Sequence, residues 1–118
     1  MSRRILVVED DRYIRESIQE LLVDEGYTVV CAENGAQALA ALEAMRQPPD
    51  LILLDLMMPV KDGFEFRAAQ RADARFADIP VVVMSADPQL ESRRGVLEAR
   101  AYLRKPVDID QLLAATTA

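Results

Sequence analysis

The sequence predicts an α/β protein, a doubly wound (βα)5 sandwich built on a five-stranded parallel sheet. Short apolar runs alternate with longer amphipathic stretches five times along the chain. The runs are rich in valine, isoleucine and leucine on both faces, which is typical of parallel strands that helices cover on both sides. A chain of 118 residues has the usual size of one domain, so we expect a single domain over residues 1–118.

The first strand and helix follow directly from the N-terminus. Residues 5–8 are a continuous apolar run, which predicts a buried strand. Residues 11–25 carry large apolar side chains at helical spacing, and Gly26 stands where a C-terminal cap is expected. The apolar positions of this helix are Ile14, Ile18, Leu21 and Leu22.

The second unit begins with residues 28–31, a short run rich in β-forming side chains. Asn34 can accept the hydrogen bond of a helix N-cap, and Pro48 with Pro49 ends the helix that follows. We expect the apolar face of this helix to consist of Ala36, Leu39, Ala40 and Met45.

The third and fourth units are less regular. Residues 51–54 predict the third strand, and a helix with a weak apolar pattern follows Gly63. Pro80 introduces the fourth strand over residues 81–84, and Pro88 is placed as the first residue of a fourth helix. The large apolar residues of that helix are Leu90, Val96 and Leu97.

The last unit consists of a short strand at residues 102–103 and a helix that Asp108 caps. Leu112 and Leu113 form the apolar face of this helix, and residues 114–118 are expected to fray. In doubly wound sheets the ligand site lies beyond the carboxyl ends of the strands.

Composition excludes several classes of function. The formal net charge of −6 argues against direct, non-specific nucleic-acid binding. The absence of histidine excludes a Ser-His-Asp triad, a histidine-based zinc site and a phosphohistidine carrier. Cys31 has no partner for an internal disulfide. The apolar run before Glu9 is too short for a signal peptide or for membrane insertion, so we expect a cytoplasmic protein.

Four strand ends deliver polar side chains to one edge of the predicted sheet. These residues are Glu9 and Asp10, Asp55, Ser85 and Lys105. Converging carboxylates repel one another, by roughly 4 kcal/mol for a pair about 4 Å apart at an effective dielectric of about 20. A hard divalent cation relieves this repulsion, and Mg²⁺ suits a site of a few oxygens, waters and a phosphate.

A site of this kind favours phosphoryl transfer. Asp55 could attack phosphorus while Mg²⁺ and Lys105 neutralise the phosphoryl oxygens. The hydroxyl group of Ser85 could then bind a phosphoryl oxygen.

Four segments in this order resemble the receiver domains of response regulators, and the resemblance covers essentially the whole chain. The segments read ILVVEDD (5–11), LILLDLMMPVKDG (51–63), VVVMSA (81–86) and YLRKP (102–106). The resemblance implies a flavodoxin-like fold with the strand order 2-1-3-4-5. It also implies a place in two-component phosphorelay signalling, as a phosphoacceptor that catalyses its own phosphotransfer and dephosphorylation rather than as an ordinary enzyme.

The resemblance assigns metal-site roles to four residues. Asp55 matches the phosphoacceptor, and together with Asp10 it matches the direct ligands of Mg²⁺. Glu9 matches the acid that binds Mg²⁺ through water, and Met57 matches the position that gives a backbone carbonyl to the metal.

The resemblance also implies a conformational switch. Lys105 matches the phosphate-binding lysine, followed by a cis bond to Pro106. Ser85 matches the switch hydroxyl, and Tyr102 matches the aromatic residue that moves inward after it. Packing in the core is the alternative role of Tyr102.

The implied partners are a histidine kinase or phosphotransfer protein, an unidentified downstream protein, and a second copy in a dimer formed on phosphorylation. Kinase docking is expected on the first helix near Arg12 and Arg15, together with Pro106 and Val107.

The chain departs from the family pattern in one region. Ser85 and Lys105 are 20 residues apart, a residue or two closer than in most receivers, and residues 99–101 read Ala-Arg-Ala where many relatives have Gly-Ala.

Two alternative functions stay open. One is a degenerate receiver that acts as an interaction module without phosphorylation, and the other is a Mg²⁺-dependent phosphatase with an aspartate nucleophile.

Overall fold

The computed structural model describes residues 3–58, 60–86, 95 and 97–117, and its strands and helices alternate as predicted as far as the fourth strand. The elements are β1 (Arg4–Val8), α1 (Arg12–Asp24), β2 (Thr28–Ala32), α2 (Gly35–Ala44), β3 (Leu51–Asp55), α3 (Gly63–Ala72), β4 (Val81–Ser85), β5 (Ala101–Arg104) and α5 (Ile109–Thr117). Pro88, the predicted start of a fourth helix, lies outside the described residues, as do Leu90 and Val96. Within the described part of the chain, no helix is both long and apolar enough to span a membrane.

The five strands form one parallel sheet in the order β2-β1-β3-β4-β5. This confirms the predicted doubly wound, flavodoxin-like fold. The register places Val8 opposite Leu54, so the next residues, Glu9 and Asp55, follow at the same level. Ser85 stands opposite Arg104 on the far side of β4. The carboxyl ends of β1, β3, β4 and β5 therefore meet at one edge of the sheet.

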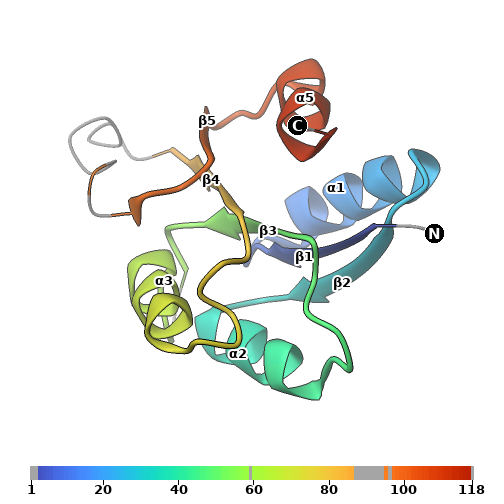
Figure 1. Ribbon diagram of the computed structural model, residues 1–118. Helices are drawn as coiled ribbons and strands as arrows, with labels where there is room; N and C mark the ends of the chain where they lie inside the picture. The colour runs from blue at the N-terminus through green and yellow to red at the C-terminus, as the bar shows by residue number, and fades with distance from the viewer. Residues whose placement is uncertain (1–2, 59, 87–94, 96, 118) are drawn as a thin grey trace.

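Helices cover both faces of the sheet, with α1 and α5 on one side and α2 and α3 on the other (Figure 1). Two apolar clusters fill the space between the layers. Leu54 and Phe66 belong to the cluster under α2 and α3, whereas Leu53 and Leu22 belong to the cluster under α1 and α5. Successive residues of β3 therefore pack on opposite faces, which explains why all five of its residues are buried.

The caps expected at Asn34 and Gly26 are confirmed, whereas two helix ends differ from the prediction. The second helix, α2, ends at Ala44 before Pro48, and α5 runs to Thr117, through most of the stretch that was expected to fray. Asp11 caps α1 by accepting from the Ile14 backbone N–H, and Asn34 caps α2 by accepting from Gln37. Gly26 follows α1 with φ +97°, a backbone conformation that favours glycine.

The apolar face of α2 differs from the prediction. Ala38 and Leu42 are buried against the sheet, while Ala36 and Ala40 are exposed. The helix has alanine or leucine on nearly every side, so spacing alone does not distinguish the buried face. In α1, Ile18 and Leu22 are buried as expected, but Ile14 is exposed.

Candidate functional site

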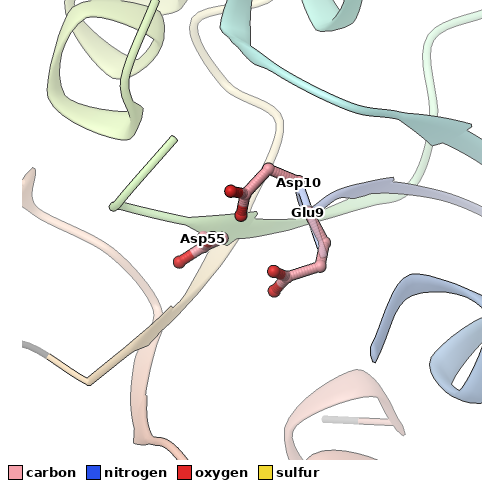
Figure 2. A group of neighbouring side chains, drawn as sticks. All are labelled: Glu9, Asp10 and Asp55. Carbon is pink, nitrogen blue, oxygen red and sulfur yellow. The ribbon is translucent and has the colours of Figure 1, made fainter. Parts of the chain in front are cut away.

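Three carboxylates meet at the carboxyl edge of the sheet. Glu9 and Asp10 follow β1, Asp55 ends β3, and one carboxylate oxygen from each lies within 4.8 Å of the others (Figure 2). Glu9 and Asp55 are buried, whereas Asp10 is exposed. The structure thus brings together the three acids that the sequence places at strand ends. An all-oxygen donor set of this charge fits a hard divalent cation.

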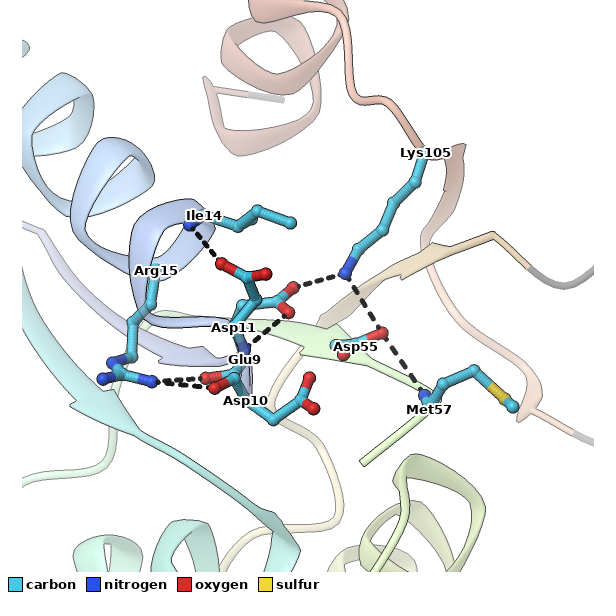
Figure 3. Close-up of polar contacts among 8 residues, drawn as sticks. All are labelled: Glu9, Asp10, Asp11, Ile14, Arg15, Asp55, Met57 and Lys105. Atoms are coloured by element: carbon cyan, nitrogen blue, oxygen red, sulfur yellow. Dashed lines mark hydrogen bonds and ion pairs between the residues drawn. The ribbon is translucent and has the colours of Figure 1, made fainter. Parts of the chain in front are cut away.

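Lys105 reaches this cluster from the end of β5. Its Nζ lies 2.6 Å from Glu9 Oε2 and 3.4 Å from Asp55 Oδ1 (Figure 3). The Lys105 backbone N–H donates to the Ser85 carbonyl at 2.9 Å, and the bond to Pro106 is cis, as predicted. The lysine ammonium is therefore held between a buried carboxylate and the proposed phosphoacceptor.

The surroundings of Asp55 disfavour its charged form. Burial and the charge of Glu9 raise the pKa of Asp55 to about 7, and its contact with Asp10 also raises it. The charge of Lys105 and the Met57 backbone N–H, which donates at 3.3 Å, act in the opposite direction. Burial lowers the pKa of Lys105, but the hydrogen bond to Glu9 and the charge of Asp55 outweigh burial, so this pKa is raised.

We expect the metal-free protein to lose stability as the pH rises from 3.8 to about 7. In this range the folded protein keeps a proton on Asp55 that the unfolded chain has released, so the free energy of unfolding falls with increasing pH. Each pKa unit corresponds to about 1.4 kcal/mol, so the expected loss is a few kcal/mol. Urea unfolding with a chelator at about pH 5 and about pH 8 measures it. Asp55→Asn should lose less stability between these pH values, and an equal loss in both proteins would contradict the assignment.

The N-terminus of α3 lies directly against the backbone of Asp55. A Cβ atom on Gly63 would lie 2.7 Å from the Asp55 carbonyl oxygen and 2.7 Å from Leu56 Cα. The Gly63 N–H also donates to the Leu56 carbonyl at 3.0 Å. Only glycine permits this approach, so Gly63 helps to set the position of Asp55.

Gly63→Ala is expected to lower the free energy of unfolding by about 1–3 kcal/mol, because backbone atoms must shift to admit the methyl group. Chemical denaturation measures this loss. Gly95→Ala is the matched control, since a Cβ atom there meets nothing within 4 Å. Equal stability of the two variants would argue against the close approach.

The two predicted switch residues lie on neighbouring strands. Ser85 is fully buried at the end of β4. Tyr102 is half-buried opposite Val83, and its side chain packs against the apolar cluster under α2 and α3. Its hydroxyl oxygen accepts from the Ala99 backbone N–H at 2.8 Å. Tyr102 therefore combines core packing with a specific polar contact. The side chain of Met57 is exposed, and the metal-binding role of its backbone carbonyl stays a prediction.

Arg15 has a position that the sequence does not predict. Its side chain is only 14% exposed and points toward the turn after β1 rather than outward as a docking contact. One guanidinium nitrogen donates to the Glu9 carbonyl at 2.9 Å and to the Asp10 carbonyl at 3.4 Å. Helical spacing gives no signal for such a contact, because it depends on the path of the preceding turn.

Comparison with curated proteins finds close relatives among response regulators. The chain is 42% identical over 116 residues to the response regulator MprA of Mycobacterium ulcerans, and the match covers 97% of this chain and 48% of that protein. MprA of Mycobacterium bovis is 41% identical over the same share of this chain. The chain thus spans about half the length of the curated relatives that it matches.

Solved structures and a family model lead to the same family. The chemotaxis response regulator CheY4 of Vibrio cholerae matches with a TM-score of 0.89 at 30% identity, covering 99% of this chain and 98% of that one. TrrA of Thermotoga maritima, solved in complex with Mg²⁺–BeF, matches with a TM-score of 0.85 at 32% identity, covering 98% and 96%. Residues 5–117 match the family model of the response regulator receiver domain. The chain therefore belongs to the receiver domains of response regulators, which act in two-component signalling.

Proposed function

We propose that this receiver accepts a phosphoryl group on Asp55 from a histidine kinase or phosphotransfer protein. The observation that carries the proposal is the meeting of three carboxylates with the ammonium group of Lys105 at one edge of the sheet. The residues that would hold Mg²⁺ are Glu9, Asp10, Asp55 and the backbone carbonyl of Met57. TrrA, which has the same fold, was solved in complex with Mg²⁺–BeF, and this supports Mg²⁺ binding by the present chain. The proposal keeps the cytoplasmic location that the sequence predicts.

The chemistry follows from the positions of these groups. An oxygen of ionised Asp55 attacks phosphorus, the bond from phosphorus to the donor histidine breaks, and the imidazole leaves with the bonding electron pair. Bound Mg²⁺ supplies positive charge that favours ionised Asp55 and neutralises phosphoryl oxygens. Lys105 lies 3.4 Å from the acceptor and is placed to bind a phosphoryl oxygen. Hydrolysis of the acyl phosphate by water returns the carboxylate.

The proposed switch uses Ser85 and Tyr102. The Ser85 hydroxyl would move toward the phosphoryl group, and Tyr102 would leave its hydrogen bond to Ala99 and turn inward. The surface around β5 would then change its affinity for a downstream protein or for a second copy of the chain.

Intact-mass spectrometry after incubation with acetyl phosphate tests phosphoryl uptake. We expect one added phosphoryl group in the presence of Mg²⁺ and none with a chelator. Failure to add phosphate, together with failure to bind beryllofluoride and Mg²⁺, would favour the degenerate interaction module. Repeated turnover of phosphate esters would favour the phosphatase, which needs a second acid where this chain has Met57.

Kinase docking is proposed on an apolar groove between α1 and the segment that joins β5 to α5. The groove has a volume of about 360 Å³ and is lined by Tyr13, Ile14 and Ile109, which are all exposed. It reaches Lys105, so a protein bound there would approach the acceptor. Exposed apolar side chains around a concave surface are typical of protein interaction sites.

Ile14→Asp is expected to slow phosphotransfer from a histidine kinase about tenfold relative to uptake from acetyl phosphate, because a charge in an apolar contact costs more than 1 kcal/mol. Initial rates with the two phosphodonors measure this ratio. Val23→Asp, another exposed apolar position on α1, is the control and should leave the ratio unchanged. An unchanged ratio in Ile14→Asp would place the docking surface elsewhere.

A further inference from the structure

The turn between β1 and α1 carries two of the three acids, and hydrogen bonds hold it. The Glu9 N–H donates to the Ala32 carbonyl at 3.1 Å, and the Asp11 N–H donates to Glu9 Oε1 at 3.2 Å. Glu9 is buried and its side chain is bound to Lys105, but Asp10 is exposed. The direction of the Asp10 carboxylate therefore depends on the backbone of the turn rather than on packing. The contacts that fix this backbone decide how well the three carboxylates can bind one cation.

Arg15 contacts this backbone directly. It lies in the first turn of α1, and its own N–H donates to the carbonyl of the N-cap residue Asp11 at 2.9 Å. Its guanidinium group turns back to the carbonyls of Glu9 at 2.9 Å and Asp10 at 3.4 Å (Figure 3). Glu33, after β2, lies 3.7 Å from another nitrogen of the same group. Arg15 thus ties three consecutive carbonyl groups to the first turn of a helix.

We propose that Arg15 is a positioning residue for the divalent-cation site, acting through the backbone of Glu9 and Asp10. This inference rests on the proposed function and adds a residue to its machinery. Arg15 touches neither the acceptor oxygen nor the phosphoryl group. Its role is to hold the turn so that the Asp10 carboxylate faces those of Glu9 and Asp55.

The charge of Arg15 and its positioning role have opposite effects on cation binding. A positive charge near three carboxylates weakens the attraction for a cation, so its removal alone would tighten Mg²⁺ binding. Loss of the contacts to the two carbonyls would let the turn relax and would weaken Mg²⁺ binding. Residues that orient metal ligands from outside typically change metal affinity about 10–100-fold when they are replaced. The sign of the change therefore distinguishes the two effects.

The test is Mg²⁺ binding to the unphosphorylated protein by isothermal titration calorimetry. We expect Arg15→Gln to weaken Mg²⁺ binding about tenfold. Arg15→Lys keeps the charge but lacks the planar guanidinium fork, so we expect a smaller weakening of about threefold. Arg75→Gln is the control, because Arg75 is exposed and pairs with Glu43 and Asp73. It should bind Mg²⁺ within about twofold of the wild type.

A second readout separates positioning from general damage. The Mg²⁺ concentration that gives half-maximal phosphoryl uptake from acetyl phosphate should rise with Arg15→Gln, while the rate at saturating Mg²⁺ stays close to the wild-type rate. Equal or tighter Mg²⁺ binding by Arg15→Gln would overturn this inference but not the proposed function. If that variant does not fold, equal binding by Arg15→Lys and wild type would overturn it. Wild-type protein that binds no Mg²⁺ would overturn the proposed function as well.

Discussion

Asp55→Asn is expected to abolish phosphoryl uptake from every phosphodonor, because the amide group has no anionic oxygen to attack phosphorus. The substitution keeps the size of the side chain and lowers the repulsion that raises the pKa of Asp55 to about 7. The variant should therefore fold at least as well as the wild type at neutral pH. Loss of uptake then reports on chemistry rather than on structure. Intact-mass spectrometry with acetyl phosphate and Mg²⁺ measures the result.

Asp24→Asn is the matched control, since Asp24 is an exposed aspartate at the end of α1. It should take up one phosphoryl group at the wild-type rate. Peptide mapping of the wild-type product should place the group on the segment that contains Asp55. A phosphorylated Asp55→Asn protein would show that another residue is the acceptor, and the proposed role of the three-carboxylate cluster would be wrong.

The position of the site was predictable because it depends on strand ends. Apolar runs predict where β1 and β3 end. Glu9 follows β1, and Asp55 is the last residue of β3. In a parallel sheet these ends share one edge whatever the details of helix packing. Lys105 was predictable for the same reason, although its preference for Glu9 at 2.6 Å over Asp55 at 3.4 Å was not. The family roles of these residues stay predictions until phosphorylation and metal binding are measured.

Helix faces were less predictable than strand ends. Alanine or leucine lies on nearly every side of α2, so the alternation of apolar and polar residues carries little information about its buried face. Ile14 fits the apolar stripe of α1, yet it is exposed beside the groove that we propose for docking. An apolar residue that binds a partner cannot be distinguished from an apolar core residue by sequence spacing alone.

Polar groups inside the core were the least predictable feature. The buried stripe of α3 contains Arg67 and Gln70 beside Phe66, which explains why its apolar pattern is weak. Gln70 donates to the carbonyls of Phe76 and Ile79, so these two acceptors in the loop before β4 have a hydrogen-bond donor. Such contacts depend on where a distant loop passes, and residue spacing gives no signal for them.

Arg67 fixes the segment that leads into β5. It is 8% exposed and donates to the carbonyls of Leu97 at 2.8 Å and Glu98 at 2.9 Å, and to Gln70 Oε1 at 2.8 Å. Glu98 has φ +49°, a conformation that residues other than glycine rarely adopt. The next residue, Ala99, donates to the Tyr102 hydroxyl. Arg67 therefore stabilises the backbone that holds the proposed switch residue in its present position.

Arg67→Met is expected to lower the free energy of unfolding by about 2 kcal/mol or more, because two buried acceptors, the Leu97 carbonyl and Gln70 Oε1, lose their donor, and each costs about 1–3 kcal/mol when it is left unpaired. Urea denaturation measures the loss. Arg71→Met, four residues along α3, is the control. Its ion pair with Glu98 is exposed, so we expect a loss below about 1 kcal/mol.

A local effect should accompany the loss of stability. If Arg67 holds the segment before β5, the Ala99 amide should exchange with solvent faster in Arg67→Met, by more than the change in global stability explains. Tyr102 would then lose the contact that opposes its inward turn, and the unphosphorylated variant should shift toward the switched state. Equal stability of Arg67→Met and Arg71→Met, or unchanged exchange at Ala99, would show that the buried guanidinium does not hold this segment.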